Sequence, residues 1–342
     1  MPLDPVLQEL IDVARSMGPV DRSHLPVAEQ RRQGLEDLAK LFRDAGERGP
    51  SLPSVEDRRV PGPNGEVSVR VYRPSLAATS GGSGADAALP LHLYFHGGGW
   101  WTGDLEMVDD ECRHLAHGVP CVVVSVDYRL APEHPFPIPL EDCFAATAWA
   151  SREAASLGAD PGRLSVGGAS AGGNLAAAVC LLARERGGPP IALQVLECPA
   201  FDPTLESDSM RELGDDYMLT RDGLAVAWAY YLQRPEDRSN PLAAPLLARD
   251  LAGLPPALVI TAEYDPLRGE GEEYGRRLAA AGVPTQVTRY DGVIHGFGGM
   301  TRALAQARAC RAEITSRLSR PSRTSSARGA DARDPGGSSP TR

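Results

Sequence analysis

The segment "LSVGGASAGGNLAAA" has the residue types and spacing of an activated serine nucleophile. Ser170 lies midway between Gly168 and Gly172. An apolar run that ends at Val166 precedes it and an alanine-rich run follows, which predicts a strand, a sharp turn and a helix. Side chains at the two glycine positions would collide where the strand and the helix pack. We therefore predict that Ser170 is a nucleophile rather than a capping serine at a glycine-rich helix start.

A serine hydroxyl needs a base, and a neutral imidazole oriented by a carboxylate supplies one. Among the seven histidines, His295 follows the last predicted strand, where a loop can return over the sheet edge. A hydrogen-bonded structural histidine is the alternative reading. Asp265 follows the apolar run of "ALVITAEYDPL", with Glu263 as a strand-end neighbour, whereas Asp291 is the rival acid because it is close to His295 in sequence. The chain order serine, aspartate, histidine favours Asp265.

Acyl transfer also requires N–H donors that face the developing oxyanion. In "YFHGGGWW" three glycines follow an apolar strand, so the backbone N–H groups of Gly98 and Gly99 can point outward. The N–H group of Ala171, at the start of the helix after the serine, would be a third donor. A flexible turn is the alternative, but a turn needs only one or two glycines. We expect His96 to anchor this loop rather than to act as a catalyst.

The candidate catalytic residues each follow a predicted strand, so they can meet only if a sheet brings the ends of these strands together. Apolar strands and helical stretches alternate through most of the chain, which predicts a parallel sheet covered on both faces. The expected strands span residues 91–95, 121–126, 163–166, 191–196, 257–261 and 285–290. An alternating segment at 67–72 predicts an antiparallel edge strand. In such an α/β fold, sites form at the carboxyl ends of the strands.

The two ends of the chain and one internal segment depart from this alternation. Residues 1 to 50 contain two amphipathic helical patterns that must pack on the remainder. Their apolar faces are Val6, Leu10, Ala14 and Met17, and Leu35, Leu38, Leu41 and Phe42. Residues from about 202 to 247 read as an insertion over the sheet edge. Residues 75–90 read as a flexible loop of small residues, and the polar tail 319–342 is expected to be disordered.

Composition places the chain among ordinary globular proteins and excludes some partners. It has 342 residues, 42% of them hydrophobic, and a formal net charge of -10, which argues against binding to nucleic acid or an anionic membrane. Six scattered cysteines within apolar segments predict buried, reduced thiols rather than disulfides or a metal site. Asp4, Glu9 and Asp12 stand where a signal peptide would be basic and then apolar. We therefore expect a cytoplasmic location.

Several motifs together resemble a known family. "HGGGWW", "DYRLAPEHPFP", "GGASAGGNLA", "AEYDPLRGEGEEY" and "IHGF" occur in the order and approximate spacing of the bacterial hormone-sensitive-lipase-like branch of the α/β-hydrolases. The resemblance covers residues from about 50 to 315. It implies an α/β-hydrolase catalytic domain at 51–318 with a mostly parallel eight-stranded sheet. A helical cap would be made by residues 1–50 and the insertion.

The resemblance also implies carboxylesterase activity without a cofactor. The family's catalytic triad falls on Ser170, Asp265 and His295, and its oxyanion hole on Gly98, Gly99 and Ala171. "DYRLAPE" is a structural loop in that family. Family members are often dimers, so a homodimer is possible here.

Two departures from the family pattern affect details. Ala169 replaces the aspartate of the usual "GDSAGG" elbow, which removes a carboxylate but leaves the glycine spacing unchanged. In "LECPAFD", Glu197 and Cys198 stand where the family more often has an apolar residue and a tyrosine. These departures weaken the subfamily assignment and leave the predicted triad intact.

Three functions fit these residues. The first is a serine carboxylesterase that cleaves short- to medium-chain acyl esters through an acyl-enzyme. The second is a non-catalytic small-molecule receptor, as the similar plant gibberellin receptors are, although those lack the working histidine. The third is an acyltransferase or amidase that uses the same triad. Trp101 is our candidate for the substrate pocket. Other aromatic residues are as readily core as pocket: Trp100, Tyr217, Trp228, Tyr230 and Tyr231.

Overall fold

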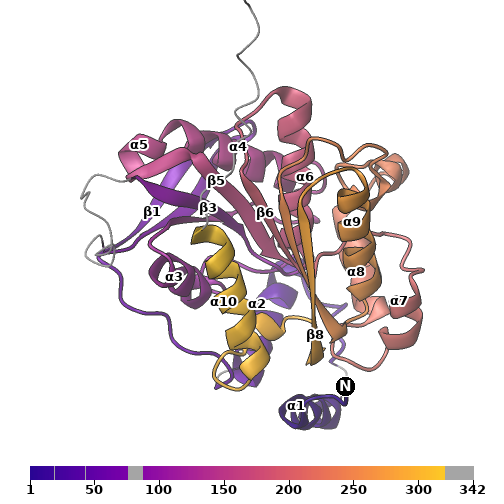
Figure 1. Ribbon diagram of the computed structural model, residues 1–342. Helices are drawn as coiled ribbons and strands as arrows, with labels where there is room; N and C mark the ends of the chain where they lie inside the picture. The colour runs from indigo at the N-terminus through magenta and orange to yellow at the C-terminus, as the bar shows by residue number, and fades with distance from the viewer. Residues whose placement is uncertain (19, 43, 76–87, 320–342) are drawn as a thin grey trace, which may run out of the picture.

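One twisted sheet forms the centre of the molecule (Figure 1). The computed structural model describes residues 1–18, 20–42, 44–75 and 88–319. Within them, eight strands have the order β1-β2-β4-β3-β5-β6-β7-β8, with β1, β2 and β4 paired antiparallel and the remaining pairs parallel. The strands are β1 (Ser54–Gly62), β2 (Gly65–Arg73), β3 (Leu89–Phe95), β4 (Val122–Asp127), β5 (Ala159–Ala169), β6 (Leu193–Glu197), β7 (Ala257–Tyr264) and β8 (Thr285–Ile294). This arrangement confirms the predicted, mostly parallel α/β sheet.

Helices cover both faces of the sheet, as a parallel sheet requires. α4, α6 and α9 pack with one hydrophobic cluster, and α3 and α10 pack with the other. The bounds of the sheet-covering helices are α3 (Asp109–Gly118), α4 (Ile138–Arg152), α6 (Ala171–Arg186), α9 (Arg268–Ala280) and α10 (Ala305–Ser319), with the short α5 (Ala154–Leu157) after α4. Every residue of β3 is buried, which explains its largely apolar sequence, interrupted by His92.

The prediction of an edge strand at residues 67–72 was wrong in one respect. The segment forms the antiparallel β2, but β1 covers its outer side and β4 lies on its other side. β1 has the sequence "SVEDRRVPG", in which four consecutive charged residues hide the alternation of a strand. Such charges are tolerated because one side of an edge strand is solvated.

The N-terminal helices α1 (Pro5–Met17) and α2 (Val27–Leu41) form where expected, but α1 buries a different face. Leu7 and Ile11 are its buried residues, whereas Val6 and Met17 of the predicted face are 46% and 61% exposed. α1 is docked at the end of β8 through Asp4, whose N–H donates to the Gly292 carbonyl over 2.9 Å. α2 buries none of its residues fully. The contacts that α1 makes where it docks, rather than its apolar periodicity, therefore decide which face of this helix is buried.

The segment between β6 and β7 contains α7 (Asp208–Leu213), α8 (Arg221–Tyr231) and the short 3-10 helices η2 (Pro235–Ser239) and η3 (Pro245–Leu247). The segment therefore departs from the alternation of strands and helices, as the sequence indicates. The division of the chain at residues 50, 202 and 247 into cap and catalytic parts stays a prediction. Most of the predicted 75–90 loop, and the predicted disordered tail from residue 320 onward, lie outside the described residues.

All six cysteines are buried, as predicted, and are free in this structure, whereas their reduced state stays a prediction. Among the helices of the described segments, none has the length and apolar character needed to cross a membrane.

Candidate active site

Ser170 occupies a strained turn between β5 and α6. Its φ of 58° and ψ of -118° lie outside the regions that non-glycine residues normally adopt, a conformation that costs on the order of 1–3 kcal/mol. The surrounding structure holds it there: the Ser170 N–H donates to the Glu197 carbonyl over 2.8 Å, and its carbonyl accepts from the N–H of Asn174 over 3.0 Å. The serine is therefore placed at the carboxyl end of β5 by backbone contacts on both sides.

The two glycines that flank the turn lie so close to the end of β3 that no side chain fits at either position. A Cβ atom at Gly168 would lie 2.2 Å from the Phe95 carbonyl oxygen, and one at Gly172 would lie 1.9 Å from the same atom. Both distances are far below contact distance, and the obstacle is backbone that cannot turn away. The predicted collision is therefore present, and its partner is a neighbouring strand end.

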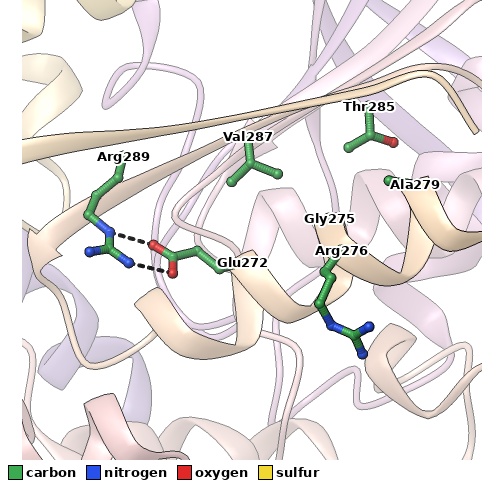
Figure 2. A pocket seen from close by; sticks show the side chains of 7 residues that line it. All are labelled: Glu272, Gly275, Arg276, Ala279, Thr285, Val287 and Arg289. Atoms are coloured by element: carbon green, nitrogen blue, oxygen red, sulfur yellow. Dashed lines mark hydrogen bonds and ion pairs between the residues drawn. The ribbon is translucent and has the colours of Figure 1, made fainter.

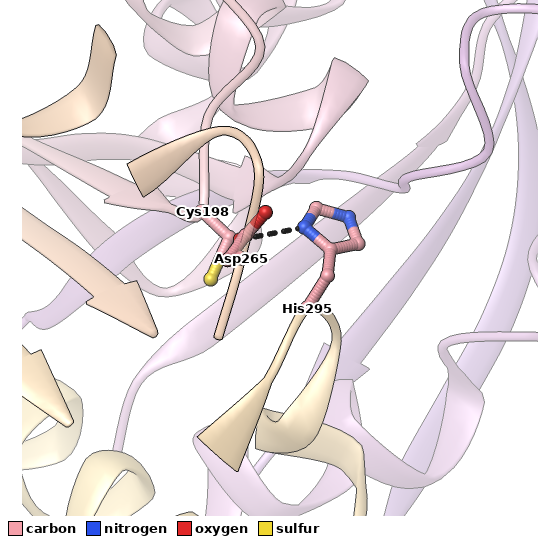
Figure 3. Close-up of side chains that lie close together, drawn as sticks. All are labelled: Cys198, Asp265 and His295. Atoms are coloured by element: carbon pink, nitrogen blue, oxygen red, sulfur yellow. Dashed lines mark hydrogen bonds and ion pairs between the residues drawn. The ribbon is translucent and has the colours of Figure 1, made fainter. Parts of the chain in front are cut away.

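His295 and Asp265 are hydrogen-bonded to each other. The His295 Nδ1 atom lies 2.8 Å from the Asp265 Oδ2 atom. Figure 3 shows the two side chains, with a dashed line for this hydrogen bond. The other carboxylate oxygen, Oδ1, accepts from the N–H of Leu267 over 2.9 Å. Asp265 is fully buried, and 15% of the His295 side chain is exposed. The rival acid Asp291 is exposed. The structure thus joins His295 to the acid that follows its own strand.

A local irregularity between β7 and β8 directs the chain toward His295. The register shifts after Ala262, so that Tyr264 pairs with Ile294. Gly292 has a φ of 73°, and its N–H donates to the Glu263 carboxylate over 2.7 Å. Irregularities of this kind, such as β-bulges, change the direction of the side chains that follow them. Glu263 is therefore the strand-end neighbour that was expected, and its carboxylate holds the turn ahead of His295.

The glycine loop after β3 lies directly against the serine turn. A Cβ atom at Gly97 would lie 3.6 Å from the Ser170 Cβ atom. Gly98 has a φ of 107°, and a Cβ there would lie 2.2 Å from the Thr102 carbonyl oxygen. The N–H groups of Gly98 and Gly99 find no acceptor among the described residues. The loop therefore brings bare backbone next to the serine, which a plain turn does not require.

Aromatic packing holds this loop in place. The Tyr128 hydroxyl donates to the His96 carbonyl over 2.8 Å, and the two rings stack with centroids 4.2 Å apart. Burial lowers the pKa of His96 to about 4, so its imidazole is neutral and suited to an anchoring role. Trp100 is completely buried, with ring centroids 4.3 Å from Trp228 and 4.4 Å from Tyr231. These three aromatic residues are core.

Comparison with known proteins agrees with this geometry. A family model described as alpha/beta hydrolase fold matches residues 92–299. The chain belongs to the α/β-hydrolase family. Its branch is the hormone-sensitive-lipase-like one, and the relatives found at about 40% identity are esterases.

Individual relatives match this α/β-hydrolase over most of their length. The carboxylic ester hydrolase LipN of Mycobacterium tuberculosis is 40% identical over 86% of this chain and 77% of LipN. The ethyl acetate hydrolase of Pseudomonas putida is 33% identical over 90% of this chain and 95% of that protein. The solved structure of a hyperthermophilic esterase from the archaeon Pyrobaculum calidifontis has a TM-score of 0.85 and 40% identity, and the match covers 93% of this chain and 98% of that one.

A second serine–histidine contact in this hydrolase has a structural role. His92 Nδ1 lies 2.8 Å from the Ser165 hydroxyl, which also donates to the Leu91 carbonyl over 3.2 Å. Both residues are interior to paired strands, and His92 is only 1% exposed. Burial lowers the pKa of His92 to about 3, so this ring stays neutral. The contact satisfies two buried polar groups and gives a substrate no access.

One group of metal-ligand type occurs in the described part of the chain. Ligand atoms of Cys198, Asp265 and His295 all lie within 4.8 Å of one another. Because Asp265 and His295 already hydrogen-bond to each other, no ion is needed to explain the arrangement. The expectation of no cofactor and no metal stays a prediction.

Figure 2 shows a groove lined by side chains of α9 and β8. It has a volume of about 440 Å³ between α9 and β8, and includes the ion pair of Arg289 with Glu272 at 2.6 Å. None of the predicted site residues lines it. The groove is therefore not the candidate active site.

Arg31 of α2 clamps the glycine loop, a role that the sequence did not indicate. Its guanidinium donates to the Trp101 carbonyl, to the Ala131 carbonyl over 2.6 Å, and to both oxygens of the Glu133 carboxylate. These hydrogen bonds hold the pKa of Glu133 below its ordinary value. A lone arginine on an amphipathic helix gives no sequence signal of its partners, which lie 70 to 102 residues away.

We expect Arg31→Met to lower kcat for ester hydrolysis by about tenfold, because the Trp101 and Ala131 carbonyls lose a charge-assisted donor. Arg32→Met is the matched control, since Arg32 is the next residue of the same helix and, among the described residues, pairs only with Glu29 and Glu36. Steady-state kinetics and melting temperatures of both variants make the measurement. Equal kcat in the two variants would show that the clamp does not act on the site.

Proposed function

We propose that this α/β-hydrolase is a serine carboxylesterase that cleaves short- to medium-chain acyl esters through an acyl-enzyme. The observation that carries the proposal is the His295–Asp265 hydrogen bond at 2.8 Å, at the same sheet edge as the strained Ser170. The names of relatives support it, since they include an ethyl acetate hydrolase and an arylesterase.

In the first step, the Ser170 hydroxyl attacks the ester carbonyl while His295 Nε2 takes the hydroxyl proton. Asp265 accepts from His295 Nδ1, so the proton on the ring sits on Nδ1 and the other nitrogen is left as the base. Once the ring is protonated, the buried carboxylate stabilises the imidazolium. The imidazolium then gives its proton to the leaving alcohol as the carbon–oxygen ester bond breaks.

The negative charge on the carbonyl oxygen is received by backbone donors. We assign this role to the N–H groups of Gly98, Gly99 and Ala171. Ala171 is the first residue of α6, whose N-terminus has unpaired N–H groups and a partial positive charge. Because these donors belong to a packed loop and a helix, they need little reorganisation when the charge forms.

Water completes the cycle. His295 takes a proton from a water molecule, the resulting hydroxide attacks the acyl carbonyl, and the ester bond to Ser170 breaks with return of the proton to its oxygen. An alcohol or amine in place of water would give acyl transfer by the same residues. Hydrolysis is the reaction that the names of the relatives support.

Trp101 is proposed to contact the substrate. It is partly exposed, in contrast with the neighbouring Trp100, and its ring meets Tyr230 of α8 edge-on at 5.5 Å. An apolar wall between the glycine loop and α8 suits an acyl or alkyl group of limited size.

A series of p-nitrophenyl esters from acetate to palmitate tests this function. We expect the highest kcat/KM at acyl chains shorter than decanoate, and covalent labelling of Ser170 by a fluorophosphonate. A preference for palmitate would refute the chain-length proposal. Stoichiometric binding of a small molecule without any turnover would favour the receptor alternative, and turnover only with an alcohol or amide would favour the transferase or amidase alternative.

We further propose that the protein acts in the cytoplasm on small-molecule esters, since six buried free thiols suit a reducing compartment. A homodimer is also a proposal, to be tested by light scattering.

A further inference from the structure

Cys198 follows β6 directly and is held in an unusual backbone conformation. Its φ of 43° lies in the left-handed region that non-glycine residues seldom adopt. The Cys198 N–H donates to the Ile260 carbonyl of β7 over 2.8 Å, and the residue is only 5% exposed. The cysteine is therefore fixed between two strand ends rather than placed on a free loop.

Its sulfur lies beside the acid–base pair of the site. The ligand atoms of Cys198, Asp265 and His295 are all within 4.8 Å of one another, and Figure 3 shows the three side chains together. They come from three places in the chain: the end of β6, the loop after β7 and the loop after β8.

The Asp265 carboxylate has room for the thiol as a partner. An ionised carboxylate offers about four acceptor positions, and a fully buried one is costly unless donors occupy them. Leu267 N–H uses Oδ1 and His295 uses Oδ2, each through one hydrogen bond. A third donor would restrict the rotation of the carboxylate about its Cβ–Cγ bond.

We propose that Cys198 is a positioning residue whose S–H group donates to Asp265 and holds the carboxylate in the orientation that His295 requires. This inference rests on the proposed function, because it assigns a role within the same site. Burial and the nearby Asp265 charge raise the pKa of the thiol well above its ordinary value, so the sulfur keeps the proton that it donates. The thiol is neither oxidised nor alkylated in this role.

The donated hydrogen bond has an electrostatic consequence. It withdraws electron density from the carboxylate and so weakens the hold of Asp265 on a protonated His295. Loss of the donor should stabilise the imidazolium, and the acidic limb of the rate profile should move toward higher pH. The other ionisable groups nearby are Glu197 of β6, Glu270 of α9 and Cys310 of α10, and all three are unchanged in the variants compared.

The test compares Cys198→Ala, Cys198→Ser and the control Cys143→Ala, which empties a buried thiol position on α4. We expect Cys198→Ala to lower kcat about tenfold with little change in KM, because a buried acceptor loses a donor. The acidic limb of the pH profile of kcat/KM should move toward higher pH in this variant. Cys198→Ser, which restores an O–H donor, should return both kcat and the profile toward the wild type, and Cys143→Ala should change neither.

NMR titration of the His295 ring protons in the same proteins, without substrate, gives a readout that does not depend on turnover. A shifted midpoint in Cys198→Ala alone supports the proposal even if the esterase assignment fails. Should Cys198→Ala fold poorly, Cys198→Gly removes the donor while suiting the φ of 43°. The proposal is overturned if the donor-free variant keeps the wild-type midpoint, or if serine and alanine behave alike.

Discussion

Ser170→Ala is expected to reduce kcat for p-nitrophenyl butyrate by about ten-thousandfold or more, because no other hydroxyl can form the acyl-enzyme at this position. Alanine keeps the backbone of the turn and removes only the attacking oxygen. The variant should therefore melt close to the wild type, and it should no longer be labelled by a fluorophosphonate. Stopped-flow or plate-reader kinetics over a long time course set the limit on the residual rate.

Ser165→Ala is the matched control for this loss. It also removes a serine hydroxyl that contacts a histidine, but that pair lies inside the sheet. Its expected cost is about 1–3 kcal/mol of stability from an unsatisfied buried imidazole nitrogen, with kcat near the wild-type value. Comparable activity loss in both variants would mean that the serine at the turn is not the nucleophile.

Asp265→Asn is expected to lower kcat about a thousandfold to ten-thousandfold while the protein stays folded. The amide has almost the same shape, but it carries no charge to stabilise an imidazolium. Its NH₂ group also favours the tautomer of His295 in which Nδ1 is the acceptor. The proton would then sit on the nitrogen that must act as the base.

Asp291→Asn separates this effect from a general loss of negative charge. Asp291 is exposed and close to His295 in sequence, so it is the acid that local sequence alone would suggest. We expect its replacement to change kcat by less than about twofold, since exposed charges are screened. A larger loss in Asp291→Asn than in Asp265→Asn would contradict the assignment of the acid.

The sequence by itself determined the parallel sheet, the serine turn and the glycine loop. These features depend on local rules: apolar runs of strand length, helical periodicity, and glycine where backbone approaches backbone. Gly168 and Gly172 are an example, because their spacing predicts that a side chain at either position would collide with a neighbour. The structure shows that this neighbour is the Phe95 carbonyl. The order of Ser170, Asp265 and His295 along the chain was likewise enough to nominate all three residues.

Only the tertiary structure decided which residues far apart in the chain meet. It joined His295 to Asp265 rather than Asp291, buried Trp100 and turned α1 onto Leu7 and Ile11. It also placed Cys198 beside Asp265 and the Arg31 guanidinium on the glycine loop, for which the sequence has no local signal. The physical reason is that an amino-acid sequence shows secondary-structure propensities and the spacing of residues. Contacts between distant segments depend instead on how complete helices and strands pack against one another.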